Sequence, residues 1–283
     1  MNPYIQSLRL RTLPLSMSGI VLGTGLAGWL DWYVFVLAIC TTLSLQILSN
    51  LSNELGDAQK GTDSDQHGRA AYGLQAGTIT TRQMKGMIGL FIGLCVVFGT
   101  ALVLTAFRPW SSKLGEVCIF LVLGLLAIIG AMTYTLGKHS YGYMGLGDLG
   151  VFLFFGLLST MGSYYLQAQT LTWEAFGCGV AIGLPCVGVL NLNNIRDMNN
   201  DRAHGKRTFA SMLGTKGGKI YHTCLLVTSL ILFAVWGHYL ALLIVPVWAW
   251  HIVYIWRNEG SALDIQMPVL MFSTLVVSGV AWL

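Results

Sequence analysis

Charged residues are scarce in this sequence. Only 10% of its 283 residues are Asp, Glu, Lys or Arg, against roughly a quarter in soluble domains. Nine apolar stretches, each near the length of about 20 residues that crosses a bilayer as a helix, contain none of these four residues. They cover 13–30, 33–52, 87–107, 117–136, 149–166, 175–192, 220–237, 238–256 and 267–283. With a mean hydropathy of +0.65, the composition excludes a water-soluble core and predicts an all-α polytopic membrane protein of nine transmembrane helices.

Two further absences narrow the class of protein. The six cysteines all lie in apolar stretches and show no metal-binding or redox spacing, so we expect them to pack rather than to form disulfides. The first apolar stretch is too long for a signal peptide and lacks an obvious small-residue cleavage site, so it should remain as a helix. No basic face suited to nucleic acid is visible.

The few positive charges are unevenly distributed along the chain. If the N-terminus is cytoplasmic, 14 Lys and Arg residues fall on the cytoplasmic side and only Arg108 and Lys113 fall outside. Lys and Arg accumulate on the cytoplasmic side of membrane proteins. The net charge of +4 therefore indicates topology, with the N-terminus in the cytoplasm.

Most of the polar residues gather in two connections, 53–82 and 193–219, both on the cytoplasmic side. Four spans separate them, an even number that preserves direction across the membrane. This spacing suggests a tandem repeat of four helices followed by a ninth, with a shared site where the repeats face each other. We treat 1–283 as a single domain.

The first connection opens with Asn53, Glu54 and Asp57 and continues through Lys60 to Asp63. If the second span continues as a helix, Asn53 and Asp57 lie one turn apart on the same face. In the second connection Asn193, Asp197 and Asp201 recur at four-residue steps. On one helix these three side chains would line a single face.

Carboxylates at four-residue spacing repel each other, and a bound cation removes the repulsion. Oxygen ligands without Cys or His suit Mg²⁺, which takes one or two carboxylates and completes its octahedron with phosphate and water. The interspersed cations are suited to contacting phosphate oxygens directly. These cations are Lys60, Arg69, Arg196, Lys206 and Arg207. Acids, bases and a membrane together predict an amphipathic phosphorylated lipid as ligand, although solvated loop charge remains the alternative for any single residue.

The two motifs resemble those of the UbiA superfamily of intramembrane prenyltransferases, and in detail its branch acting on 1,4-dihydroxy-2-naphthoate in menaquinone synthesis. The resemblance extends to about residue 210. It rests on Arg11-Thr12-Leu13-Pro14, Asn53 to Asp63, Gly77-Thr78-Ile79-Thr80, Gly145-Leu146-Gly147-Asp148, and Asn193 through Thr208. The chain departs from the family pattern at Glu54, where Asp is usual, and at 68–71, which leaves Arg69 as the diphosphate contact there.

The resemblance implies nine helices around a central cavity, capped by the motif loops at the cytoplasmic side of a bacterial inner membrane. It implies that the acidic motifs hold Mg²⁺, as two ions, together with a polyprenyl diphosphate. The metal ligands carried over are Asn53, Asp57, Asp63, Asp197 and Asp201, with Glu54 as a further possibility, and helix spacing adds Asn193. The implied reaction attaches the prenyl group to the naphthoate as its carboxylate is lost.

Four residues are candidates for roles beyond the diphosphate. Asp148 is a candidate for orienting or deprotonating the acceptor, and a helix N-cap is the competing interpretation. Lys138 is placed to meet the acceptor carboxylate. Tyr134 and Tyr141 could stabilise an allylic cation through their ring faces, or simply pack against lipid.

Two other functions stay open at this stage. One is a UbiA-type enzyme with another acceptor, such as 4-hydroxybenzoate, homogentisate, a porphyrin or a sugar phosphate. The other is a divalent-cation or solute transporter, in which acids inside the membrane bind the transported ion. The acids here cluster at one membrane face with none at mid-span, which favours the enzyme.

Overall fold

The computed structural model describes residues 2–28, 31–61 and 73–283. Within these ranges, eight helical runs are long and apolar enough to cross a membrane. They are α3 (Trp32–Lys60), α4 (Thr81–Ala106), α5 (Leu114–Thr133), α6–η4–α7 (Gly147–Ala168), α8 (Trp173–Arg196), α10 (Phe209–Val235), η5–α11 (Tyr239–Arg257) and η6–α12 (Gly260–Val280). The first apolar stretch also forms a helix, α2 (Leu13–Leu26), but it has only 14 residues. The all-α membrane class is confirmed, and nine spans stay a prediction.

The remaining elements are short. They are α1 (Pro3–Ser7), η1 (Leu10–Thr12), η2 (Trp110–Ser112), η3 (Tyr141–Tyr143) and α9 (Met198–Ala203). Within the composite runs the segments are α6 (Gly147–Val151), η4 (Phe152–Leu158), α7 (Ser159–Ala168), η5 (Tyr239–Ile244), α11 (Val245–Arg257), η6 (Gly260–Ile265) and α12 (Gln266–Val280).

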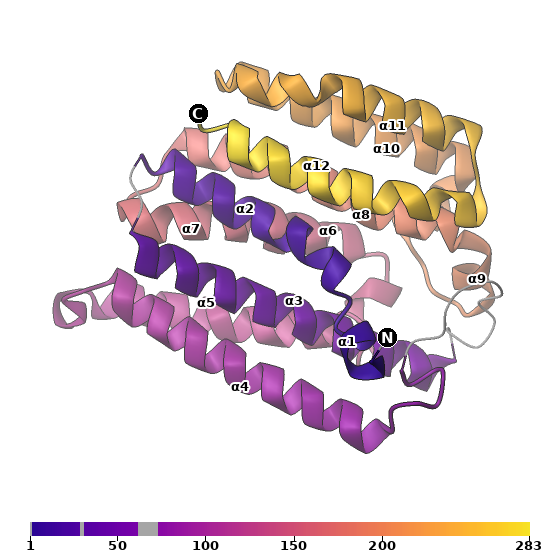
Figure 1. The fold of residues 1–283 in the computed structure, drawn as a ribbon, viewed down its shortest axis with the longest axis horizontal. Coiled ribbons are helices and arrows are strands. Elements are labelled where there is room, and N and C mark those ends of the chain that lie inside the picture. The colour runs from indigo at the N-terminus through magenta and orange to yellow at the C-terminus, as the bar shows by residue number, and fades with distance from the viewer. Residues whose placement is uncertain (1, 29–30, 62–72) are drawn as a thin grey trace.

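The long helices lie side by side, with their axes roughly aligned (Figure 1). The C-terminal ends of α3 and α8 lie at the same end of this bundle, together with α1 and α9 (Figure 1). We call this end the motif end. Arg108 and Lys113 lie in the connection from α4 to α5, at the opposite end, so the predicted segregation of charge follows the bundle axis.

The helix ends determine how far the polar motifs remain helical. The Asp31 carboxylate caps the start of α3 by accepting from the Tyr33 amide at 2.9 Å, and Gly61 ends the helix in the left-handed conformation. α3 therefore continues through Asn53 and Asp57, as expected, and the connection that follows is shorter than 53–82.

The second motif does not lie on one uninterrupted helix, which corrects the expectation from spacing. α8 ends at Arg196 and α9 begins at Met198, with Asp197 as the junction residue. The four-residue hydrogen bonds nevertheless persist, from the Asp197 amide to the Asn193 carbonyl (3.0 Å) and from the Asp201 amide to the Asp197 carbonyl (2.8 Å). The chain is interrupted at Asp197, and these two bonds connect the end of α8 to α9.

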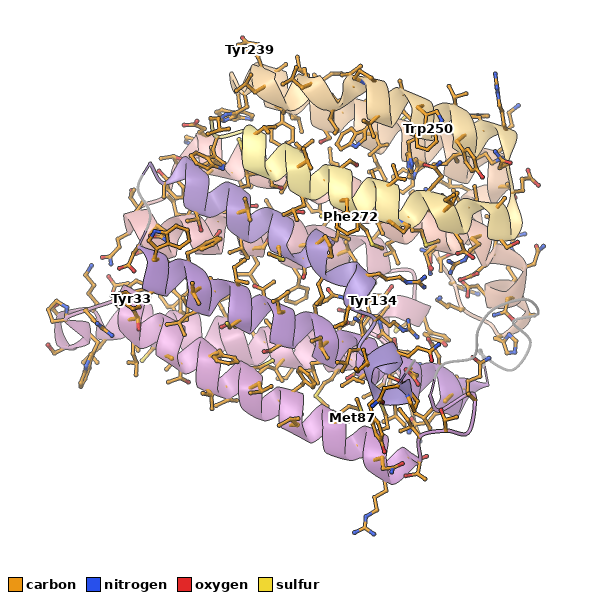
Figure 2. All side chains as sticks on the ribbon, viewed as in Figure 1. Tyr33, Met87, Tyr134, Tyr239, Trp250 and Phe272 are labelled. Carbon is orange, nitrogen blue, oxygen red and sulfur yellow. The ribbon has the colours of Figure 1, made fainter. Side chains whose placement is uncertain are left out.

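α8 is the central helix, and most of its apolar residues are buried, whereas most of those on α5 are exposed. It packs against α10 and against η4, a π-helical segment. A Cβ added at Gly156 would lie 2.6 Å from the Gly183 Cα, so the two backbones meet at glycines. On the outside, large apolar and aromatic side chains such as Tyr33, Tyr239 and Trp250 are exposed, as expected of a surface in contact with lipid (Figure 2).

Candidate active site

A cavity of about 420 Å³ lies inside the bundle and changes character along its length. At the motif end its lining is polar, and toward the other end it is apolar. The polar lining includes Asn53, Asp57, Tyr134, Thr135, Tyr141, Tyr143, Asn193 and Lys206; the apolar lining includes Ile20, Leu102, Val103, Phe120, Phe154, Leu158 and Leu166. Such a cavity suits a molecule with a polar head and a hydrocarbon tail.

A second cavity of about 620 Å³ adjoins the first between α5 and the η4–α7 run. Both cavities are lined by Phe120, Leu123, Phe154 and Leu158. Its lining is almost wholly apolar, with Glu116 at one edge. The apolar part of the main cavity therefore extends sideways toward the lipid-facing α5.

The first motif contributes two oxygen-bearing side chains to the polar part of the cavity. The Asn53 Oδ1 accepts a hydrogen bond from the Thr135 hydroxyl at 2.5 Å. The Asp57 Oδ1 accepts one from the Tyr143 hydroxyl at 2.8 Å. Among the described residues, no Lys, Arg or His forms an ion pair with Asp57.

Glu54, on the same motif, faces away from the cavity. Its side chain is fully buried. It accepts hydrogen bonds from the Ser7 hydroxyl at 3.2 Å and from the Leu74 amide at 2.9 Å. Glu54 thus links α1 and the segment before α4 to α3, and it does not line the cavity.

Arg196 organises the beginning of the second motif. Its guanidinium donates to both Asp197 carboxylate oxygens, at 2.8 and 2.6 Å, and also to the Asn193 side-chain oxygen and the Asp264 carboxylate. A fifth bond goes to the Met267 sulfur at 3.2 Å. Since the Arg196 side chain is only 6% exposed, these five bonds occupy it. Asp264, on η6, was not identified from the sequence because it follows Arg196 by 68 residues without a spacing signal.

The end of the second motif pairs one acid with one base. Lys206 Nζ lies 3.2 Å from Asp201, whose side chain is almost fully buried. Burial raises the pKa of the Asp201 carboxyl above its ordinary value, and the nearby Lys206 ammonium opposes that rise. Lys206 lines the cavity, whereas Asp197 and Asp201 lie behind its lining.

Tyr143 lies between the two motifs and was missed in the sequence. Its hydroxyl donates to Asp57, and its backbone carbonyl accepts from the Arg207 amide at 3.1 Å. Lys60 Nζ lies 3.8 Å from the centroid of the Tyr143 ring, and Lys206 Nζ lies 5.7 Å from it. Because η3 is a single short helical turn without a charged residue, the sequence gave no signal for this role.

Lys60 is held by the connection after α5. Its ammonium donates to the Thr135 carbonyl at 2.6 Å and to the Ser140 hydroxyl. Ser140 and Thr135 are both buried. The predicted cation is therefore at the polar part of the site, with its ammonium over the Tyr143 ring.

Two further tyrosines, Tyr134 and Tyr141, line the cavity, with their rings 5.2 Å apart and edge to face. The Tyr141 hydroxyl donates to the Gly130 carbonyl at 3.0 Å, and burial raises its pKa to about 12. Burial also raises the pKa of Tyr134, and the charges of Tyr141, Asp148, Asp57 and Asp201 add to that rise. Both hydroxyls are neutral donors at physiological pH. Tyr134 lies within the bundle (Figure 2).

Three further predicted residues, Asp148, Lys138 and Arg207, lie outside the cavity lining. Asp148, on α6, has its carboxyl against the Tyr221 hydroxyl of α10, and its side chain makes no helix cap. Lys138 and Arg207 are exposed. Asp63 and Arg69 fall outside the described residues. The ligand and acceptor roles of all these residues stay predictions.

Comparison with known proteins identifies the family. The profile of the UbiA prenyltransferase family matches residues 13–275. The chain belongs to this family. It is 45% identical to the 1,4-dihydroxy-2-naphthoate octaprenyltransferase of Escherichia coli over 237 residues, covering 83% of this chain and 76% of that protein. It is 37% identical to the protein of the same name from Haemophilus influenzae over 267 residues, covering 90% and 85%.

Solved UbiA structures share this fold. A UbiA homologue from Aeropyrum pernix matches with a TM-score of 0.70 at 15% identity, covering 95% of this chain and 98% of that one. A UbiA homologue from Archaeoglobus fulgidus bound to GPP and Mg²⁺ matches with a TM-score of 0.64 at 14% identity, covering 98% and 99%. The UbiA fold of this chain is therefore seen both in its sequence and in its helix arrangement.

Proposed function

We propose that this UbiA protein transfers a polyprenyl group from a prenyl diphosphate to 1,4-dihydroxy-2-naphthoate, a step of menaquinone synthesis. The supporting observation is the cavity with Asp57, Asn193 and Lys206 at its polar part and a hydrocarbon lining beyond. Relatives at 45% and 37% identity carry the name of that activity. A diphosphate at the polar part would place its prenyl chain along the apolar lining.

The residues at this site fit Mg²⁺ shared with a substrate. The donors are carboxylate and amide oxygens, which suit a hard ion. Among the described residues, no three His, Cys, Asp or Glu side chains are close enough to hold a metal by themselves. Mg²⁺ is usually bound by one or two protein carboxylates, and substrate phosphate oxygens and water complete its coordination shell.

In the proposed enzyme, Asp57 of the first motif and Asn193 of the second would hold Mg²⁺. Asp197, Asp201 and Asp63 would be further ligands, and the site would hold two ions. Bound there, Mg²⁺ supplies positive charge that neutralises the diphosphate. Related structures solved with DMAPP or GPP and Mg²⁺ support this use of the ion.

The protein groups then act on the two ends of the breaking bond. Lys206 and Lys60 stabilise the negative charge that develops on the diphosphate as the allylic carbon–oxygen bond breaks. The Tyr134 and Tyr141 rings face the same cavity and shield the allylic carbon from water. A carbon–carbon bond then forms to the electron-rich ring, and the acceptor loses its carboxylate as CO₂.

The same proposal assigns the motif end to the cytoplasm of a bacterial inner membrane. The support is the position of Arg108 and Lys113 alone at the opposite end, with the other described Lys and Arg residues at the motif end. Water-soluble acceptor and Mg²⁺ would then enter from the cytoplasm, and the prenyl diphosphate from the lipid.

The test supplies purified protein in detergent with farnesyl diphosphate, Mg²⁺ and either 1,4-dihydroxy-2-naphthoate or 4-hydroxybenzoate. We expect a prenylated naphthoquinol with release of CO₂, and loss of product when EDTA is added. Product only from 4-hydroxybenzoate would reassign the acceptor. Absence of any product, with Mg²⁺ uptake in proteoliposomes instead, would favour the transporter.

A further inference from the structure

We propose that Tyr143 is a positioning residue that holds Asp57 in the orientation needed for metal and diphosphate and joins it to the second motif. This inference rests on the proposed function, because it assigns to Asp57 a role toward the diphosphate. It concerns a segment, η3, that lies in neither acidic motif.

The first observation is the contact to Asp57. The Tyr143 hydroxyl donates to Asp57 Oδ1 at 2.8 Å. Since a hydroxyl donor satisfies one lone pair and adds no positive charge, the contact fixes one Asp57 oxygen without forming an ion pair. The other oxygen is left to turn toward a ligand in the cavity that both residues line.

The second observation is the contact to the second motif. The Tyr143 carbonyl accepts from the Arg207 amide at 3.1 Å, and the adjacent Met144 pairs with Arg207 as an isolated parallel bridge. Arg207 directly follows Lys206, the cavity-lining cation. One residue therefore connects the acid of the first motif with the base of the second.

The third observation concerns the two cations. The Tyr143 ring has Lys60 Nζ at 3.8 Å and Lys206 Nζ at 5.7 Å from its centroid. The face of an aromatic ring attracts ammonium groups. The ring thus brings two mutually repelling charges to one part of the cavity, where a diphosphate with several negative charges would bind.

The test compares Tyr143→Phe with Tyr143→Leu in the full-length protein in detergent. Phe keeps the ring beneath the lysines and removes only the hydroxyl, whereas Leu removes both. We expect Tyr143→Phe to raise the Mg²⁺ concentration for half-maximal activity, and the KM for farnesyl diphosphate, by about tenfold, the usual effect of one lost hydrogen bond to a charged group. We expect a smaller change in kcat, and a larger rise in KM for Tyr143→Leu.

A purely structural role would instead lower the melting temperature and the amount of active enzyme while leaving both concentration dependences unchanged. The matched control is Tyr254→Phe, since the Tyr254 hydroxyl donates to the Ala262 carbonyl on the outer part of the bundle and does not line the cavity. We expect this control to behave as the wild type.

Titration of farnesyl diphosphate without acceptor, at several Mg²⁺ concentrations, gives a second readout that requires no turnover. If Tyr143 acts through Asp57, the binding loss of the double variant Tyr143→Phe/Asp57→Asn should be less than the sum of the single losses. Additive losses, or wild-type Mg²⁺ dependence of Tyr143→Phe, would overturn the positioning role.

The same measurements separate the two proposals. Wild-type protein that binds farnesyl diphosphate with Mg²⁺ but makes no naphthoquinol contradicts the proposed function, and the Tyr143 comparison is still decided by binding. Product formation with an unchanged Tyr143→Phe contradicts only the positioning role. Wild-type protein that shows no Mg²⁺-dependent binding contradicts both.

Discussion

The two acidic motifs occupy equivalent ends of α3 and α8, yet their carboxylates are partnered in different ways. Asp57 accepts from a neutral tyrosine. Asp197 is paired with Arg196, and Asp201 with Lys206. Asp57 also lines the cavity, whereas the two acids of the second motif lie behind the lining.

This difference separates two tasks within one site. In the second motif each acid is paired with a base of the same motif, so its acids fix the positions of Arg196 and Lys206. The first motif has a carboxylate at the cavity surface that, among the described residues, forms no direct ion pair, and this arrangement favours an incoming cation. We infer that a metal adds charge balance mainly on the α3 side, while the α8 side supplies the cation for the diphosphate.

The largest effect is expected for Asp57→Asn, which removes the charge and keeps the shape. Prenyl transfer should fall at least about a hundredfold, since a preorganised charge at the reacting centre is lost. The free energy of unfolding should change by only about 0.5 kcal/mol, because the Asn oxygen still accepts from Tyr143. Turnover with 1,4-dihydroxy-2-naphthoate at saturating Mg²⁺, together with thermal unfolding in detergent, measures the two effects.

The companion variant Asp201→Asn sharpens the same contrast. It should lose both activity and stability, because it leaves the Lys206 ammonium without its carboxylate in a poorly exposed position. Equal stability loss in the two variants, or near-normal turnover of Asp57→Asn, would contradict the division of tasks.

Much of this arrangement could be predicted from sequence. Runs without charge located the helices, and four-residue spacing placed Asn53 and Asp57 on one face of α3, because both signals are local. Residues joined to the motifs by tertiary contact could not be found in this way. Asp264 reaches Arg196 from η6, and Tyr143 reaches Asp57 from η3, and neither has a spacing relation to its partner.

Local spacing also gave no indication of where the Glu54 side chain points. Glu54 lies between Asn53 and Asp57 in sequence but points about 100° away from Asn53 around the helix, into contacts with Ser7 and Leu74. The interruption at Asp197 is similarly invisible, because residues 193–201 have no proline or glycine to indicate it. Both depend on what packs beside the helix.

A smaller effect is expected for Arg196→Gln, which tests whether the ion pairs of the second motif stabilise the fold. Two carboxylates, Asp197 and Asp264, lose their shared cation. The cost should be about 2–3 kcal/mol of unfolding free energy, less than for a wholly buried pair because Asp264 is 40% exposed. Chemical denaturation in detergent measures it, with Arg257→Gln on the exposed end of α11 as the control. An unchanged free energy of unfolding would contradict this prediction and would mean that the bonds of Arg196 to these carboxylates do not stabilise the fold.

Next in size is Glu54→Gln, which tests whether sequence proximity to Asp57 implies a shared role. The Gln oxygen can still accept from Ser7 and Leu74, so the loss should be about 1 kcal/mol of stability from weaker, uncharged hydrogen bonds. The Mg²⁺ concentration for half-maximal turnover should stay at the wild-type value. A rise comparable to that of Tyr143→Phe would mean that Glu54 reaches the metal after all.

The smallest effect is expected for Ser140→Ala, on the first-motif side of the comparison. The Ser140 hydroxyl is one of two acceptors for the Lys60 ammonium, and the Thr135 carbonyl is the other. With one acceptor removed, Lys60 should remain over the Tyr143 ring but less firmly fixed, which raises the KM for farnesyl diphosphate about threefold and leaves kcat unchanged. Steady-state kinetics at fixed Mg²⁺ measures the change, with Ser112→Ala at the opposite end of the bundle as the control. A change in kcat without a change in KM would place Lys60 at the reacting carbon rather than at the diphosphate, and the first motif would then contribute more than metal binding.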